Sequence, residues 1–176
     1  LIHFAAAGNA LPGMTGNASM GYPASLPSVV GIGAIDASGA IWSRSHGGAA
    51  ADLLAPGVAI TTTDRTGTDG AGPGDYFVDD GTSYSSPFAA GVAALVLFKK
   101  PDLEPAALEA LLANSALIAG NGKILDARAA TLVAHGATPL PVILSLQEPT
   151  GLGAGAAGTH RGYWVTSIPD VNGDGK

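Results

Sequence analysis

The sequence predicts an α/β layered fold with a mainly parallel sheet, and three observations carry that prediction. Short, continuous apolar runs bounded by Gly, Pro, Asn and Asp are typical of strands buried on both faces. Segments with helix-start signals follow these runs, so strands alternate with helices. Hydrophobic residues make up 47% of the 176 residues and charged residues only 12%, which indicates a large buried fraction.

The expected strands are short and end at turn residues. The first apolar run stops at Gly8-Asn9, and the second stops at the turn that begins with Asp36. The residues between these two runs, 10–27, are expected to form a loop because Gly, Pro, Ser and Asn recur in them. The strand regions are residues 1–7, 28–35, 52–62 (one or two short strands) and 76–79.

Helices are expected in the second half of the chain, at about 83–100, 104–114 and 126–134. Pro87 suits the first turn of a helix, where a missing N–H costs little. From Phe88 to Phe98 every residue is apolar or glycine, so we expect the first of these helices to be buried.

The composition changes at His135, which divides the chain into regions. Residues 135–158 contain prolines and a Gly-Ala tract and are expected to be a linker, and residues 159–176 begin a short β-rich extension. That extension ends in Asp-x-Asn-x-Asp-Gly, which places oxygen ligands at alternate positions as a calcium loop requires. It resembles the calcium loop of an FG-GAP/VCBS-type repeat or, as an alternative, of a dockerin, and a solvated acidic turn is the plain alternative. The candidate calcium ligands are Asp170, Asn172 and Asp174.

Charge and cysteine content narrow the classes of partner. The net charge of −6 and the absence of a Lys/Arg cluster argue against nucleic acid as a partner. No apolar run reaches the roughly 20 residues that span a bilayer, so no membrane insertion is expected. The chain has no cysteine, which excludes disulfides and cysteine-based metal sites. No organic cofactor is expected, since Gly31-x-Gly33 lacks the third glycine of a dinucleotide fingerprint.

The most informative segment runs from Asp80 to Gly91, as Asp-Gly-Thr-Ser-Tyr-Ser-Ser-Pro-Phe-Ala-Ala-Gly. It delivers Ser83 to the start of an apolar helix, where backbone N–H groups and the positive end of the helix dipole favour a bound anion. A hydrolase would present a nucleophile in this way. The competing interpretation is that Ser83 is a helix N-cap, a position that serine also favours.

This segment resembles the serine motif of the subtilisin-like serine proteases, Gly-Thr-Ser-x-Ala/Ser-x-Pro-x-x-Ala-Gly. Four further regions match that family in its order. They are Phe4–Asn9, Gly21–Ala34, Leu54–Ile60, and a set at Leu103–Ala106, Leu111-Leu112 and Gly122–Ala127 that resembles the closing helices. The resemblance covers residues 1–134 and implies the C-terminal part of a three-layer peptidase domain.

The resemblance also implies roles for individual residues. Ser83 would be the nucleophile, and the Asn9 side-chain amide together with the Ser83 N–H would bind the developing oxyanion. Ala6, Ala7 and Gly8 would form one wall of the pocket for the residue before the scissile bond, with Gly21 setting its depth. Protein or peptide substrates, structural calcium, secretion to the extracellular space and a monomeric state of the intact protein are implied as well.

In the order of that family, the Asp and His of the catalytic triad both precede the oxyanion asparagine. Here eight residues precede Asn9, and His3 lies where the family has an apolar residue. We therefore expect the triad Asp and His to lie upstream, and this chain alone to be inactive. Such a fragment is also expected to expose a sheet edge.

Two other functions compete with the protease. His46-Gly47-Gly48 resembles the oxyanion loop of esterases, and Ser83, Asp126 and His135 follow the α/β-hydrolase order, but the second glycine of the nucleophile elbow is missing. The third possibility is a degenerate protease domain that serves as a calcium-dependent adhesion or scaffold module.

Overall fold

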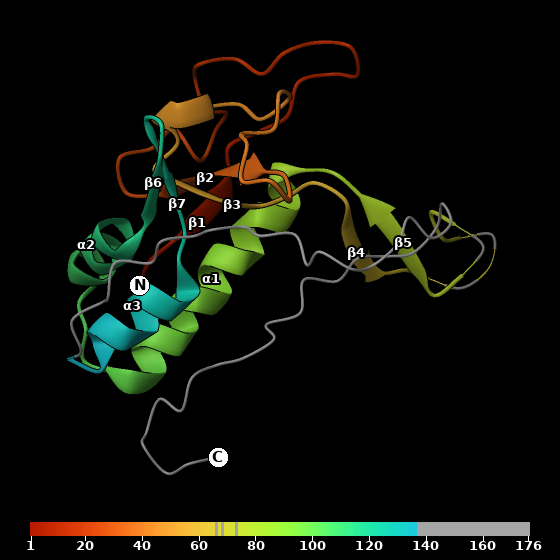
Figure 1. Cartoon of the computed structure of the whole chain (residues 1–176). Coiled ribbons are helices and arrows are strands. Elements are labelled where there is room, and N and C mark those ends of the chain that lie inside the picture. The colour runs from red at the N-terminus through yellow and green to blue at the C-terminus, as the bar shows by residue number, and fades with distance from the viewer. Residues whose placement is uncertain (66, 68, 73, 137–176) are drawn as a thin grey trace, which may run out of the picture. The chain divides into compact units, whose positions relative to one another are not determined.

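The computed structural model describes residues 1–65, 67, 69–72 and 74–136. Its main sheet has five strands in the order β1-β2-β3-β7-β6 (Figure 1). Neighbouring strands from β1 to β7 pair in parallel, and β6 and β7 form an antiparallel hairpin. The mainly parallel α/β sheet is therefore confirmed. The strands are β1 (Phe4–Ala6), β2 (Val30–Ile35), β3 (Leu53–Pro56), β6 (Leu117–Ala119) and β7 (Gly122–Ile124).

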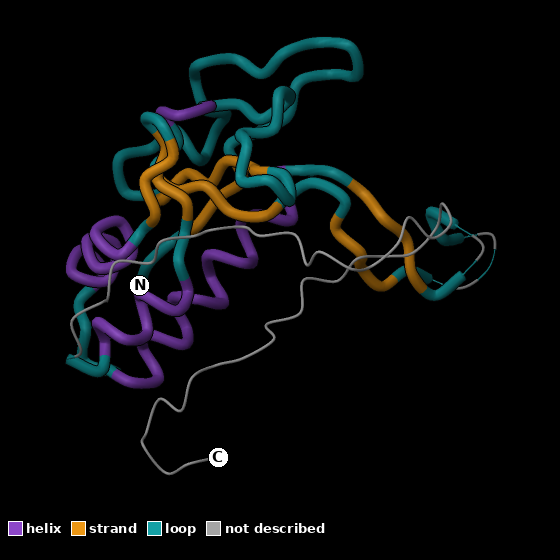
Figure 2. Tube along the Cα trace, in the orientation of Figure 1, coloured by secondary structure: helices purple, strands orange, loops and turns teal. Residues whose placement is uncertain are grey.

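The helices gather on one face of this sheet, and long loops cover the other face (Figure 2). Alternate residues of β3 define the two faces: Leu53 and Ala55 pack in the cluster that contains α1 residues, and Leu54 packs in a second cluster with Ile35 and Ala51. The sheet is thus covered on both sides, as a parallel sheet requires. The helices are α1 (Thr82–Lys99), α2 (Pro105–Ser115), α3 (Ala127–Ala134) and the short 3-10 helix η1 (Gly48–Ala50).

Helix α1 positions the site because it packs along β1, β2 and β3. Its inward face carries small and β-branched residues that let it approach the sheet closely. Ala89, Val92, Ala93 and Val96 are at most 8% exposed and form the centre of the larger core cluster.

The expectation that α1 would be buried all round is wrong for the described residues. Phe88, Leu95 and Phe98 are 46%, 54% and 78% exposed. They recur at helical spacing on the side of α1 away from the sheet, and α1 therefore has one buried and one exposed apolar face.

The segment Gly122–Ala127, which was expected to belong to the closing helices, instead contains β7. Three-residue strands are too short to give a periodic pattern, so the sequence analysis missed both β6 and β7. Gly120, with φ +57°, makes the tight turn between them. Gly122 lies against Leu54, since a Cβ on Gly122 would be 2.6 Å from the Leu54 Cδ1 atom.

Two further strands form a ribbon of their own. β4 (Ile60–Thr63) and β5 (Tyr76–Asp79) pair in antiparallel register, with Ile60 opposite Asp79, and β5 leads directly into α1. In Figure 1 this ribbon approaches the start of α1 from the right, whereas β1 ends on the left of it. The start of α1 therefore lies between two separate parts of the chain.

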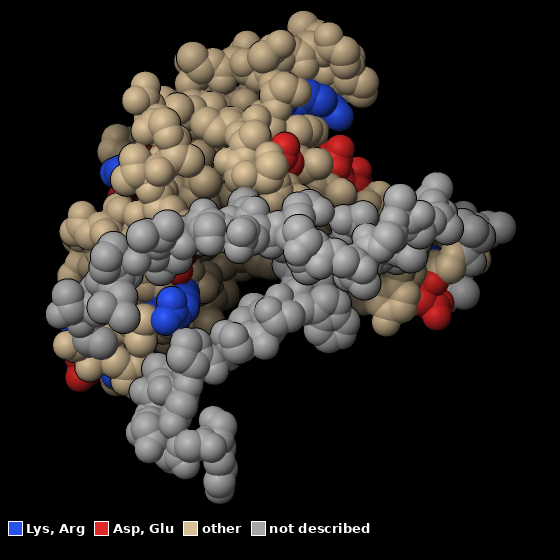
Figure 3. Space-filling model, in the orientation of Figure 1, with Lys and Arg blue, Asp and Glu red and all other residues tan. Residues whose placement is uncertain are grey.

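The edges of the main sheet match the sequence expectation. Within the described residues, β1 pairs with β2 alone, so it is an edge strand, and its residues are partly exposed. Most of the described surface in Figure 3 is uncharged, with Lys and Arg scattered over it. No helix in the described residues is long and apolar enough to cross a membrane.

Candidate active site

The site is built at the start of α1. Gly81 precedes the helix in an extended conformation and its N–H donates to the Gly57 carbonyl at 2.7 Å. The buried Ser85 hydroxyl donates to the Ala55 carbonyl at 3.1 Å. Both acceptors belong to the end of β3 or follow it directly, so the first turn of α1 is fastened to the carboxyl edge of the parallel sheet. Ligands in α/β sheets are typically bound at this edge.

Thr82 connects the start of α1 with Asn9. The Thr82 N–H and the Thr82 hydroxyl both donate to Asn9 Oδ1, at 3.0 and 2.9 Å. The same hydroxyl accepts from the Gly8 N–H at 3.1 Å. Because a backbone N–H can only donate, these bonds fix which end of the amide is the oxygen. The Asn9 Nδ2 donor is therefore directed away from Thr82.

Two nitrogen atoms, Asn9 Nδ2 and the Ser83 backbone N, lie close to the space above Gly81. A Cβ built on Gly81 would be 3.5 Å from Asn9 Nδ2 and 3.6 Å from the Ser83 backbone nitrogen. The Ser83 N–H lies in the first turn of α1, where a backbone N–H has no partner within the helix. A small group placed above Gly81 would therefore lie within 3.6 Å of two nitrogens that carry N–H groups.

The Ser83 side chain is exposed at the edge of this space, and its hydroxyl makes no hydrogen bond to any other described residue. The N-cap interpretation of Ser83 is wrong, because Gly81 is the N-cap of α1 and no side chain caps the helix. The hydroxyl is left for another role.

The four residues expected to form a substrate pocket lie together. Ala7 is fully buried, and its carbonyl accepts from the Gly21 N–H at 2.8 Å. Gly8 has φ +104°, and a Cβ there would be 2.6 Å from the His46 ring, so this position excludes a side chain. Ala6 ends β1 immediately before them. The Tyr22-Pro23 bond that follows Gly21 is cis.

The residues of the esterase alternative serve other purposes. The Asp126 carboxylate accepts from the Ala129 N–H at 2.8 Å and caps α3, and His135 ends the same helix. His46 Nδ1 accepts from the Asn17 N–H at 2.8 Å. Moreover, β5 belongs to the separate ribbon and not to the main sheet, so Ser83 does not follow a central strand as a nucleophile elbow requires.

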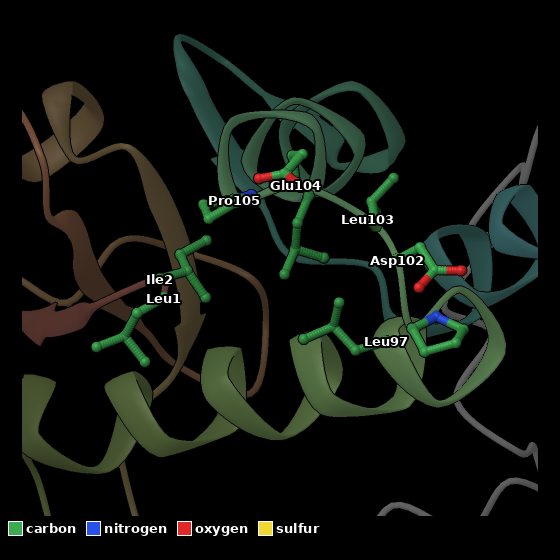
Figure 4. Close-up of a pocket in the computed structure, with 9 residues that line it drawn as sticks. Leu1, Ile2, Leu97, Asp102, Leu103, Glu104 and Pro105 are labelled. Carbon is green, nitrogen blue, oxygen red and sulfur yellow. The ribbon is translucent and has the colours of Figure 1, made fainter.

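No group of three or more His, Asp or Glu side chains able to hold a metal is found among the described residues, and Asp170, Asn172 and Asp174 lie outside them. A cavity of about 290 Å³ lies at the opposite end of α1 from Ser83. Leu97, Ile2 and Leu103 line it, with the carboxylates of Asp102 and Glu104 beside them (Figure 4). It contributes nothing to the serine site.

The sequence analysis missed two contributors to the site. The Thr82 hydroxyl orients Asn9. The Tyr84 hydroxyl donates to Asp79 Oδ2 at 3.0 Å, and the Tyr84 Cδ2 atom would be 3.5 Å from a Cβ on Gly81. Burial, and then the hydrogen bond to Asp79 and its charge, raise the pKa of Tyr84. Only their positions on either side of Ser83 could have drawn attention to them, because the sequence does not show which atoms will meet.

The chain is similar in sequence and in structure to known proteins. A sequence model of the subtilase family, Peptidase_S8, matches residues 1–150. The chain is 42% identical over 118 residues to subtilisin amylosacchariticus of Bacillus subtilis subsp. amylosacchariticus, which covers 66% of this chain and 29% of that protein. It is 42% identical over 101 residues to an extracellular protease of Xanthomonas campestris pv. campestris, which covers 57% of this chain and 17% of that one.

A solved structure shows the same likeness in three dimensions. The self-cleaved protease domain of PatA superimposes with a TM-score of 0.59 at 30% identity, over 76% of this chain and 50% of that domain. The sequence therefore spans about half of that solved domain, and less than a third of the subtilisin.

Proposed function

Because this chain belongs to the subtilase family of serine peptidases, we propose that it supplies the nucleophile and the oxyanion hole of a peptide-bond hydrolase. One observation carries the proposal. A Cβ built on Gly81 would be 3.5 Å from Asn9 Nδ2 and 3.6 Å from the Ser83 nitrogen, and the Ser83 hydroxyl has no partner among the described residues, which supports the proposal.

In the proposed reaction, Ser83 Oγ attacks the carbonyl carbon of the scissile peptide bond. The carbonyl oxygen becomes an oxyanion that accepts from Asn9 Nδ2 and from the Ser83 N–H. The C–N bond then breaks, the amine leaves with the proton taken from Ser83, and the acyl group stays on Oγ until water hydrolyses the ester. Thr82 holds Asn9 in register throughout, because Asn9 Oδ1 accepts two bonds from it.

The proton transfer requires a general base that the described residues do not bring to Ser83. No described histidine is hydrogen-bonded to Ser83, and His46 uses Nδ1 to accept from Asn17. We propose that a histidine and its orienting aspartate come from a part of the domain outside these 176 residues, and that these residues alone do not hydrolyse peptides. The relatives support this, since the matched region is about half of the PatA protease domain.

Other properties follow as proposals from the family and the pocket. Protein or peptide substrates would place a large apolar side chain against Ala6–Gly8, since Gly21 leaves room there. Secretion is proposed because one relative is named an extracellular protease. Calcium binding at Asp170, Asn172 and Asp174 remains a prediction, which equilibrium dialysis with calcium would test.

A fluorophosphonate probe tests the function on the complete protein that contains this chain. The probe should label wild type and the Ser86→Ala variant but not Ser83→Ala. Ser86 is a suitable control because it lies one turn further along the same helix. Labelling that survives in Ser83→Ala would exclude Ser83 as the nucleophile. No labelling and no peptide cleavage in wild type would contradict the enzyme and favour the adhesion or scaffold alternative.

A further inference from the structure

Tyr84 and Asp79 form a connected wall beside the proposed oxyanion hole. The Tyr84 ring reaches the same space as Asn9 Nδ2, since each has an atom 3.5 Å from a Cβ built on Gly81. Any substrate carbonyl in that space therefore lies against the Tyr84 ring as well as against the donors. Tyr84 itself follows Ser83 directly in the first turn of α1.

The Asp79 carboxylate is held in place from both sides. Its Oδ2 accepts from the Tyr84 hydroxyl at 3.0 Å, and its Oδ1 accepts from the Asp80 N–H at 2.8 Å. Asp79 ends β5, and the Tyr84 hydroxyl that it accepts from belongs to the residue after Ser83. Within the described part of the chain, no Lys or Arg forms an ion pair with Asp79, and its charge is not neutralised.

The strands that carry this wall and the expected acyl pocket reach the start of α1 from different directions. The pocket residues Ala6–Gly8 arrive with β1, whereas Asp79 arrives with β5, and Figure 1 shows these strands reaching the start of α1 from opposite sides. A peptide with its acyl part against Ala6–Gly8 and its scissile carbonyl above Gly81 must then extend its leaving part toward Tyr84 and Asp79.

We propose that Tyr84 and Asp79 select a basic side chain, Lys or Arg, on the leaving side of the scissile bond. An aromatic face attracts a cation through its quadrupole, and a fixed carboxylate adds a direct charge interaction. The same carboxylate repels an acidic side chain. The hydroxyl of Tyr84 faces Asp79, so the pair presents the ring and the charge as one unit.

This inference rests on the proposed function and is tested with it in the complete protein. Peptides that differ only in the residue after the scissile bond, Lys, Ala or Glu, should be cleaved with kcat/KM values in the order Lys, Ala, Glu. We expect a threefold to tenfold preference for Lys over Ala, which is about 0.6–1.4 kcal/mol, because exposed ion pairs and cation–π contacts are both modest. The preference should shrink in 1 M salt.

The Asp79→Asn variant should bring the Lys/Ala ratio close to one because it removes the charge. Its single side-chain oxygen can still accept from the Tyr84 hydroxyl, and the exposed Asp80 N–H then loses its bond to this side chain. Asp69→Asn is the matched control, because it removes the same charge from the loop of the same ribbon, where Asp69 pairs with Arg65 at 3.2 Å. The control should keep the wild-type ratio.

Three outcomes overturn the inference. They are no preference in wild type, an equal loss of preference in Asp69→Asn, and an unchanged preference in Asp79→Asn. The two proposals fail separately: activity that persists in Ser83→Ala removes the proposed function, whereas an enzyme that depends on Ser83 but shows no charge preference removes only the subsite.

Discussion

Replacing Thr82 with Val should uncouple the orientation of Asn9 from the packing of α1. Val has nearly the shape of Thr, so the fully buried site keeps its volume. The substitution removes the bond from the Thr82 hydroxyl to Asn9 Oδ1 and leaves the Gly8 N–H without its acceptor. An unsatisfied, partly buried donor costs about 1–3 kcal/mol, which should appear as a lower urea midpoint of the complete protein.

Turnover by this variant should fall less than in Asn9→Ala. The Thr82 N–H still donates to Asn9 Oδ1 at 3.0 Å, so part of the orientation survives. We expect about a threefold to tenfold loss of kcat, equivalent to one weakened hydrogen bond of about 0.7–1.4 kcal/mol. Asn9→Ala should lose about 10²- to 10³-fold, the range already known for this donor in a subtilisin.

The Thr82→Ser variant is the matched control for this prediction. It keeps the hydroxyl and loses a buried methyl, so stability should fall by about 1 kcal/mol while kcat stays near wild type. Equal losses of kcat in the Ser and Val variants, measured on the same peptide, would refute the reasoning, since the effect would then come from packing and not from the hydroxyl.

Three further predictions concern backbone and pH. Gly8→Ala should lower the urea midpoint more than Gly13→Ala. Both positions have positive φ (+104° and +82°), but only at Gly8 would a Cβ meet a neighbour, the His46 ring at 2.6 Å. Urea midpoints that fell equally would contradict this. The pKa of Tyr84 is raised by burial and then by Asp79. The stabilisation of the fold by neutral Tyr84 is therefore present below the unfolded pKa of about 10 and is lost as pH rises through the higher folded pKa. Asp79→Asn should move the tyrosinate absorbance titration to lower pH, and an unmoved curve would remove Asp79 as a cause. The Ser38 hydroxyl holds the pKa of Asp36 below its usual 3.8. The stabilisation of the fold by ionised Asp36 is therefore present above pH 3.8 and is lost as pH falls through the folded pKa. An NMR titration of Ser38→Ala should show a higher Asp36 pKa, and an unchanged value would exclude the hydroxyl as the cause.

The elements that the sequence predicted well are those with strong local signals. The apolar run at 28–35 contains β2, and α2 (Pro105–Ser115) lies where a helix was expected at about 104–114. The strand β7 was missed because three residues carry no period, and its existence depends on pairing with β3 far back in the chain. The exposed face of α1 was missed because an all-apolar segment does not say which side is covered.

The site divides in a similar way. Motif order indicated Ser83 and Asn9, and in the structure a Cβ built on Gly81 would be 3.6 Å from the Ser83 nitrogen and 3.5 Å from Asn9 Nδ2. The contribution of Thr82 could not be predicted, because its hydroxyl meets a residue 73 positions away and the sequence does not show which atoms will meet. The same limitation applies to Tyr84, whose partner Asp79 is five residues away but is brought into reach by the turn.

The bonds from Thr82 to Asn9 also indicate at what stage of folding this part of the site forms. They join residues 73 apart in the chain, and the bond from Gly8 to Thr82 spans 74. Contacts of such long sequence separation form late, because the entropy of closing the intervening loop must be overcome first. In the unfolded chain, Asn9 and the residues around Ser83 are not yet held together by these bonds. Thr82 can therefore hold Asn9 only after these two distant segments have paired, so this part of the site forms with the tertiary fold and not before it.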